Sequence, residues 1–189
     1  MRRSGHASLA FTAAPCLVTL LVTGFATGAP ARSLRHARCR ITQLELVVDP
    51  NTPSPKTGQN PLVLSLTNHG IAACFLRGYP DVWLQDRAGV IPFSIRHGND
   101  QMVTGRQPRQ VLIRPDGAAF VLLNNYRCDL GPRRAAQTLT LRLPATPHRA
   151  GNALTVLTHG VPRYCGQGDP GSIVVVSPFE PTITLTLNN

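Results

Sequence analysis

Cysteine is the residue type in this chain whose chemistry is most open to interpretation. Five cysteines are present, and four of them are scattered singly after position 31: Cys39, Cys74, Cys128 and Cys165. Zinc sites usually hold pairs of ligands two to four residues apart, a spacing that these four cysteines lack. An even number of well-separated cysteines indicates two disulfides instead, provided that the chain reaches an oxidising compartment.

Four cysteines allow three pairings. We favour Cys39 with Cys74 and Cys128 with Cys165, because each bond closes a local segment and neither loop crosses the other. On the chain-entropy description, a loop of this size stabilises the fold by roughly 3–4 kcal/mol.

Histidines and aspartates give no pattern typical of catalysis or metal binding. The histidines after position 31 are isolated from one another and have no metal-ligand spacing: His36, His69, His97, His148 and His159. Asp81, Asp86 and Asp100 could act in pairs on a glycan, but their spacing does not place any two together. The chain also lacks a Gly-x-Ser-x-Gly nucleophile elbow. We therefore expect a protein that is not an enzyme and that uses no cofactor or metal.

Arg77, Tyr79 and Trp83 form the most interesting local group. Tyr, Trp and Arg are enriched at binding hot spots, and aromatic rings can stack on a sugar or anchor a protein partner. The alternative is structural, since Trp83 alternates with Val82 and Leu84 on a short strand and Tyr79 could brace the Gly-Tyr-Pro bend through its hydroxyl. These three residues are the candidate binding residues.

The first 31 residues have the features of a secretory signal peptide. Arg2 and Arg3 precede an uncharged stretch, and a run of small residues ends in Ala29-Pro30-Ala31, the expected cleavage site. A retained membrane anchor is the alternative, but the apolar stretch is interrupted by Thr and Pro and is shorter than the roughly 20 residues of a span. Cys16 lies inside the stretch, which argues against a lipid-modified cysteine. We expect a secreted or cell-envelope protein without a stable membrane span.

The chain is basic, with a formal charge of +10. Such a charge attracts anions, so an anionic cell-wall polymer is a possible partner. The basic residues are nearly all Arg and are spread along the sequence, without the clustered stripe or interleaved aromatics of a nucleic-acid-binding surface. A nucleic-acid partner is therefore not expected.

Alternating apolar residues predict strands along residues 32–189. The expected strands are 44–48, 62–67, 82–85, 111–113, 118–124, 138–143, 153–157, 173–177 and 182–187. Pro- and Gly-containing turns separate them, and two longer connections, 92–109 and 144–152, could carry binding residues. The pattern favours a single all-β domain, an immunoglobulin-like antiparallel β-sandwich. One immunoglobulin hallmark does not fit, because Trp83 follows the second cysteine rather than lying between a pair.

Residues 62–89 carry a more specific signature. Thr67-Asn68 ends a strand, Cys74 follows, and Gly78-Tyr79-Pro80 leads into a strand and a turn at 86–89. This segment resembles the family catalogued as domain of unknown function 4232, found in secreted and lipid-anchored actinobacterial proteins. The resemblance extends to Cys39 and Leu44, to the turn and strand at 115–120, and to Cys128, Cys165 and Ser177-Pro178.

The resemblance implies a secreted β-sandwich with two disulfides and brings no activity with it. Taken with the residues, it suggests a non-enzymatic binding module of the cell envelope or extracellular space, contacting an unidentified protein or a wall polymer. A self-associating structural domain is the main alternative, and a glycan-acting enzyme is a more remote one.

Overall fold

Strands dominate the computed structural model, which describes residues 36–144 and 152–188. The expected all-β class is confirmed, and most neighbouring strands are antiparallel. The predicted signal peptide, including Cys16, lies outside the described residues, and so does most of the connection 144–152.

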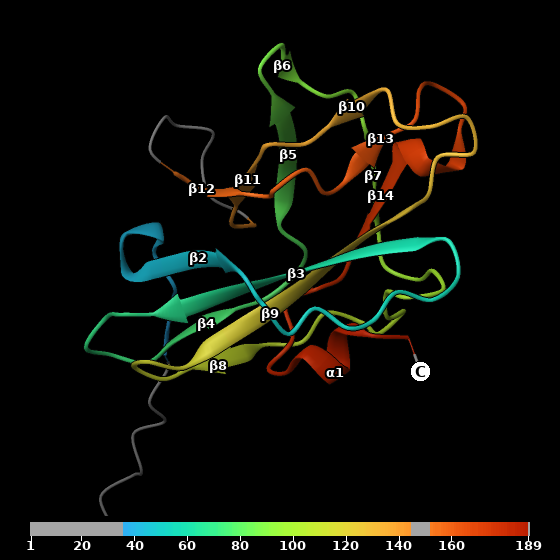
Figure 1. The fold of residues 1–189 in the computed structure, drawn as a ribbon. Coiled ribbons are helices and arrows are strands. Elements are labelled where there is room, and N and C mark those ends of the chain that lie inside the picture. Colours follow the sequence, from blue (N-terminus) through green and yellow to red (C-terminus); the bar gives the residue numbers. More distant parts are fainter. Residues whose placement is uncertain (1–35, 145–151, 189) are drawn as a thin grey trace, which may run out of the picture. The chain divides into compact units, whose positions relative to one another are not determined.

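A five-stranded sheet forms the centre of the fold (Figure 1). Its order is β2 (Leu44–Val48), β3 (Gln59–Asn68), β9 (Ala118–Tyr126), β14 (Ile173–Val176) and β7 (Ser94–His97). Neighbours are antiparallel except β7, which runs parallel to β14. Both faces of this sheet are covered, because alternate residues of β3 and β9 belong to two different apolar clusters.

A four-stranded sheet packs against one face of the central sheet. Its order is β12 (Ala153–Leu157), β11 (Thr138–Arg142), β5 (Asp81–Asp86) and β6 (Gly89–Val90). Leu84 of β5 lies opposite Leu139 of β11 in the register. Both residues are buried, and so is Leu141 of β11. They share one core cluster with Leu64 and Val121 of the central sheet, so the main core lies between the two sheets.

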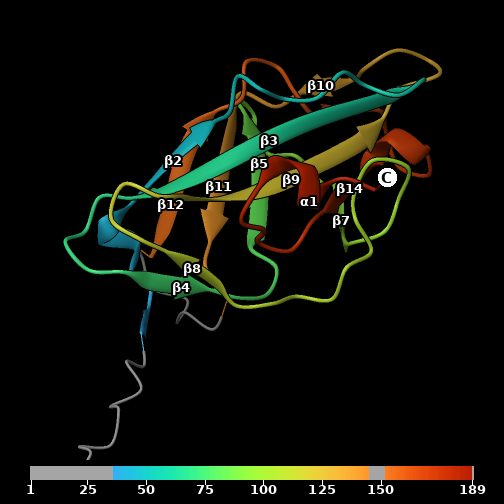
Figure 2. The same ribbon diagram turned by 90° about the horizontal axis from the view of Figure 1, so that it is seen from below.

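Smaller elements close the ends of this core. Figure 2 shows the pair β4 (Cys74–Leu76) and β8 (Val111–Ile113) beside the central sheet, and β1 (Ala37–Arg38) pairs with β4 in parallel. The other pieces are the pair β10 (Arg134–Ala135) and β13 (Arg163–Tyr164) and the 3-10 turns η1 (Ile41–Gln43) and η2 (Pro170–Ser172). Buried Leu76 and Ile113 extend the main core.

The prediction of a strand at 182–187 is wrong. This segment forms a single helical turn, α1 (Ile183–Thr186). Ile183 and Leu187 are four residues apart and both pack on the second cluster, on the outer face of the central sheet. One helical turn brings residues i and i+4 to the same side, so the alternation was coincidental.

The connection 92–109 contains a strand that the alternation of apolar residues did not predict. Strand β7 occupies Ser94–His97 and is exposed along its whole length. An exposed strand beside a buried one needs no apolar alternation, because its backbone pairing to β14 holds it in place.

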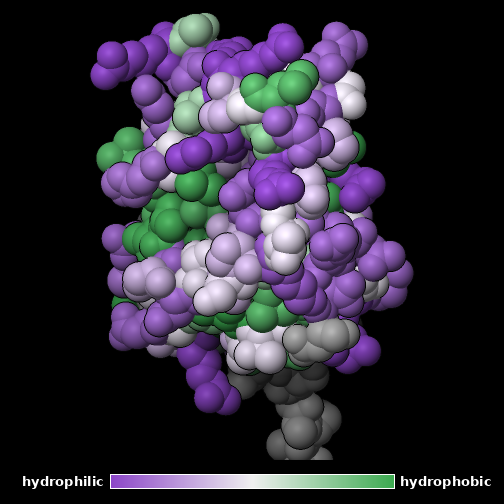
Figure 3. Space-filling view, turned by 45° about the vertical axis from the view of Figure 1, so that its right-hand side comes forward, coloured by the Kyte–Doolittle hydropathy of each residue, from purple (hydrophilic) through white to green (hydrophobic). Residues whose placement is uncertain are grey.

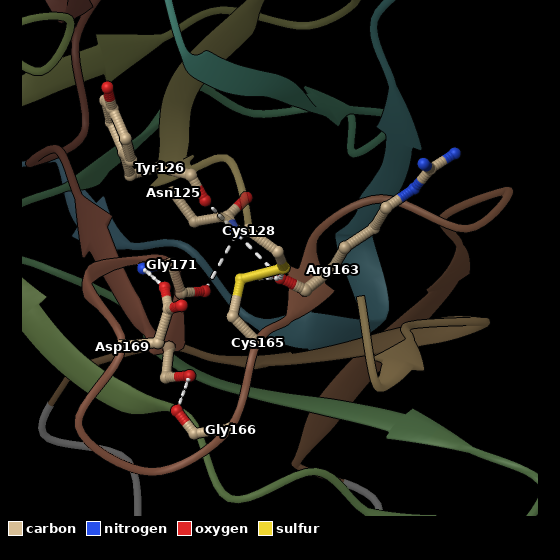
Figure 4. The surroundings of a disulfide bond; sticks show 9 residues. Asn125, Tyr126, Cys128, Arg163, Cys165, Gly166, Asp169 and Gly171 are labelled. Carbon is tan, nitrogen blue, oxygen red and sulfur yellow. Dashed lines mark hydrogen bonds between the residues drawn. A yellow bond between two sulfur atoms is a disulfide. The ribbon is translucent and has the colours of Figure 1, made fainter. Parts of the chain in front are cut away.

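Both predicted disulfides are confirmed. The Cα atoms are 4.9 Å apart in Cys39–Cys74 and 5.1 Å apart in Cys128–Cys165. Figure 4 shows how the second bond is embedded, with the Asn125 side-chain amide donating to the carbonyls of Arg163 and Gly171. A Cβ at Gly171 would overlap the Cys165 sulfur, so only glycine fits there.

Asn68 explains the Thr-Asn signature. Its side chain is fully buried, donates to the carbonyls of Ala72 and Ile113, and accepts from Gln43 Nε2 and the Gly70 backbone. Its backbone also pairs with the 116–117 turn. The residue therefore ties β3, the following turn and β8 together, which makes this part of the signature structural.

Candidate functional site

Trp83 lies in the wall of a shallow hollow between the edges of β5 and β7. Because Val82 and Leu84 face the main core, the intervening Trp83 points to the opposite face of its sheet, where it is half-buried. The hollow has a volume of about 250 Å³. We call it the Trp83 hollow and define it by Asp81, Val82, Trp83, Ile95, His97 and Arg142.

Asp81 and Trp83 are the described residues that hold Arg142 in this hollow. The register of β5 and β11 places Arg142 opposite Asp81 and Thr140 opposite Trp83. Arg142 donates to Asp81 Oδ2 from Nε at 3.1 Å and from Nη2 at 2.6 Å. Its guanidinium carbon also lies 4.9 Å from the centre of the Trp83 ring, within the range of a cation–π contact. Both the charge and the ring are therefore fixed before any partner arrives.

Tyr79 borders the same region through a ring stack. The Tyr79 and His97 rings lie 4.4 Å apart and are nearly parallel, with an interplanar angle of 4°. This contact joins the Gly-Tyr-Pro bend to the end of β7, and His97 itself lines the Trp83 hollow. Within the described parts of the chain, Tyr79 thus braces the bend by stacking and not by a hydroxyl hydrogen bond.

Arg77 is separated from the other two candidates. It lines a smaller hollow of about 60 Å³ together with Arg38, Phe75 and Leu143. The structure therefore brings Trp83 and Tyr79 together through His97, and leaves Arg77 elsewhere.

Arg142, His97 and Ile95 were not predicted from the sequence to be members of the site. They are distant from Trp83 in the sequence, and only strand pairing brings them near. Pairing the polar face of 138–142 with that of 81–85 would have indicated Arg142, because Asp81 and Arg142 then fall opposite each other.

Two of the three aspartates considered for glycan hydrolysis lie far apart. Asp81 and Asp86 sit at opposite ends of β5, which corresponds to roughly 17 Å along an extended strand. Asp100 hydrogen-bonds Asn124 and the backbone of the 100–103 turn. Paired glycosidase carboxylates are at most about 9.5 Å apart, so Asp81 and Asp86 do not form such a pair.

Asp86 has an ionic partner of its own. Arg134 donates to its two oxygens from Nε and Nη2, both at 2.6 Å. These hydrogen bonds lower the pKa of Asp86 to about 2. The pair fixes the β5–β6 turn to the start of β10.

Other ionisable side chains among the described residues also lie close together. His69 Nε2 lies 2.7 Å from Glu45 and its Nδ1 lies 3.9 Å from Asp116, and all three side chains are solvent-exposed. Glu180 is only 4 % exposed, and burial raises its pKa although Arg106 lies 3.8 Å away. Within residues 36–144 and 152–188, no cluster of three His, Cys, Asp or Glu side chains suits a metal ion, and His148 lies outside these residues.

The visible surface is mostly polar. Figure 3 shows hydrophilic residues over most of one face, with hydrophobic residues in separate small patches. Among the described residues, no helix is both long and apolar enough to span a bilayer.

Comparison with protein families identifies a match. Residues 39–180 match the model of a family described as Domain of unknown function (DUF4232). No curated protein and no solved structure matches the chain. The matched residues run from the first cysteine of the first disulfide to Glu180 and include both disulfides and the Trp83 hollow.

Proposed function

Because the chain belongs to the DUF4232 family, whose description assigns no activity, we propose a function from the site itself. The protein is an exported, non-enzymatic binding module of the cell envelope or extracellular space. It contacts a protein or a wall polymer through the Trp83 hollow.

One observation carries this proposal, the fixed arrangement of Asp81, Arg142 and Trp83. Binding hot spots are rich in Trp and Arg, and they work best when the side chains lose little freedom on binding. Arg142 is 11 % exposed, held by Asp81 and close to the Trp83 ring, so its binding geometry is set in advance. The hollow also opens directly beside the exposed strand β7, where a partner has access.

Export is supported by two independent features. The first 31 residues have the composition of a signal peptide, and both disulfides form good geometric pairs. Disulfides persist in oxidising compartments and are rare in the cytosol. For the fold, we propose that the two packed sheets form an immunoglobulin-like sandwich.

A capture experiment tests the proposal. The immobilised protein, with both disulfides formed, is incubated with a solubilised cell-envelope fraction, and bound material is analysed for protein and for carbohydrate. Trp83→Ala should strongly reduce the specific capture. Leu130→Ala is the matched control, because Leu130 is 88 % exposed and lies outside the hollow. Equal capture by Trp83→Ala would remove the support for this site. A hydrolytic activity that disappears when one carboxylate is replaced would show that the protein is an enzyme and would overturn the proposal.

Self-association is the second candidate function, and the geometry of β7 favours it. Strand β7 is an edge strand of the central sheet and pairs with β14 alone among the described strands. All four of its residues are exposed. Such an edge can pair with a strand of another copy. Sedimentation velocity at several protein concentrations tests this alternative. A protein that stays monomeric at every concentration would exclude self-association.

A further inference from the structure

We propose that a second hollow, on the outer face of the central sheet, binds a neutral sugar ring. We call it the polar hollow; its polar lining is Gln59, Arg96, Asp100, Gln101, Asn124, Asn125 and Tyr126. Its volume is about 250 Å³. Sites for drug-sized ligands measure roughly 300–1,000 Å³, so this hollow suits a single ring.

The polar hollow is separate from the Trp83 hollow. Asn124 alternates with Leu123, which faces the main core, so the Asn124 side chain lies on the outer face of β9. Arg96 lies opposite Val175 in the register, and Val175 belongs to the outer cluster. The apolar part of the lining comes from Val175, Ile173 and Pro170, next to the ring of Tyr126, which points away from the nearby disulfide (Figure 4). The two hollows share no lining residue.

A connected set of amides forms the floor. Asn124 is 1 % exposed and its Nδ2 donates to Gln59 Oε1 at 2.5 Å and to Asp100 Oδ2 at 2.8 Å. Gln59 Nε2 in turn donates to Gln101 Oε1 at 3.1 Å. Because a carboxylate only accepts, Asp100 fixes which end of the Asn124 amide carries the nitrogen.

This arrangement leaves an acceptor without a partner. Asn124 Oδ1 is buried and receives no hydrogen bond from any described residue. A buried polar atom without a partner costs about 1–3 kcal/mol, which a bound hydroxyl or a water can recover. Because almost none of this oxygen is exposed, a polar guest reaches it only after a small movement of the Asn124 side chain.

Free donors complete the set. Among the described residues, no hydrogen bond engages the Arg96 guanidinium or the Gln101 amide nitrogen, and both residues are exposed. The positive charge of Arg96 is balanced by the negative charge of Asp100 in the same lining. A guest that both donates and accepts, and that carries no net charge, matches these groups. Sugar hydroxyls have this character, whereas phosphate would meet the Asp100 carboxylate.

The loop that supplies Asp100 and Gln101 is anchored at several points. Asp100 Oδ1 accepts from the backbone of Met102 and Val103. Asn188 donates to the Asp100 carbonyl at 2.7 Å, and Lys56 donates to the Gln101 carbonyl at 3.0 Å. Asp100 and the backbone of Gln101 are therefore pre-organised, which reduces the entropy lost when a ligand binds.

Nuclear magnetic resonance titration tests the inference. The isotope-labelled protein is titrated separately with the methyl glycosides of glucose, galactose, mannose and N-acetylglucosamine. At least one should shift the side-chain amide signals of Gln59, Gln101 and Asn124 in a saturable way. Arg96→Ala should weaken that binding about tenfold, since hydrogen bonds to charged groups are the stronger ones.

The controls separate this site from the proposed function. Arg87→Ala removes an exposed arginine elsewhere and should bind the glycoside as the parent does. Trp83→Ala should also leave glycoside binding unchanged, because Trp83 is outside the polar hollow. The inference is overturned if none of the four glycosides gives a saturable shift, if Arg96→Ala binds equally well, or if inorganic phosphate displaces the glycoside from these signals.

Discussion

The guanidinium of Arg142 lies 4.9 Å from the centre of the Trp83 ring while the same group donates to Asp81. One arginine thus joins the carboxylate and the aromatic ring of the Trp83 hollow. Its planar fork is suited to this double role, because it can donate along its edge and stack with its face. A lysine could not do both.

Arg142→Lys should therefore change the environment of Trp83 more than the stability of the fold. Trp83 is the sole tryptophan, so its fluorescence reports on this hollow alone. We expect an altered emission spectrum and a loss of stability of about 1 kcal/mol or less, as for partly exposed ion pairs. Arg87→Lys, at an exposed position in the turn after β5, should leave the spectrum unchanged. An unchanged spectrum in Arg142→Lys would show that the stack is absent in solution.

Asn68→Ala should destabilise the fold strongly. The substitution removes four side-chain hydrogen bonds and leaves the buried Ile113 carbonyl without one of its donors. Unsatisfied buried groups cost about 1–3 kcal/mol each, so we expect a total loss of roughly 2–4 kcal/mol in urea unfolding. Asn51→Ala, in an exposed turn, is the control and should lose less than about 1 kcal/mol. A loss of similar size in both would refute the structural role of the signature.

Each disulfide should contribute about 3–4 kcal/mol. The bonded cysteines are 35 residues apart in one pair and 37 in the other, and loops of this length give that value on the chain-entropy description. Replacing both Cys39 and Cys74 by Ser should lower the free energy of unfolding by this amount. The Cys128 and Cys165 double replacement should do the same, and mass mapping of the parent should find neither pair as free thiols.

Acid should weaken the fold through Asp86. Arg134 lowers the pKa of this carboxyl to about 2 in the folded protein, whereas an unfolded Asp titrates near about 3.9. The pair thus stabilises the fold above about pH 4, and this contribution is lost as the pH falls toward about 2. The free energy of unfolding is measured against pH. In Asp86→Asn its decrease between about pH 4 and pH 2 should become smaller, whereas the exposed control Asp129→Asn should keep the decrease of the parent. Parallel curves for the parent and Asp86→Asn would contradict the ion pair.

Much of the fold could be predicted from alternation and from cysteine spacing. Strands such as 44–48 and 153–157 were placed correctly, because one of their faces is more buried than the other. The exposed strand β7 and the helical turn α1 were not, since their positions depend on pairing and packing with distant residues. Local sequence does not contain that information.

The site was predictable only in part. Trp83 and Tyr79 were identifiable by residue type, but Arg142 joins them through strand register alone. Arg77 was grouped with them because it is near in sequence, and the bend at 78–80 takes it to another hollow. Proximity along a chain that turns is a poor guide to proximity in space.

The affinity of matched variants for one purified envelope ligand tests the central claim most directly. Once the capture experiment has supplied that ligand, its Kd is measured for the parent, Trp83→Ala and Arg77→Ala. We expect Trp83→Ala to weaken binding by a factor of about ten or more, as for hot-spot aromatics, and Arg77→Ala to bind like the parent. Undiminished binding by Trp83→Ala, or an equal loss in Arg77→Ala, would contradict the account.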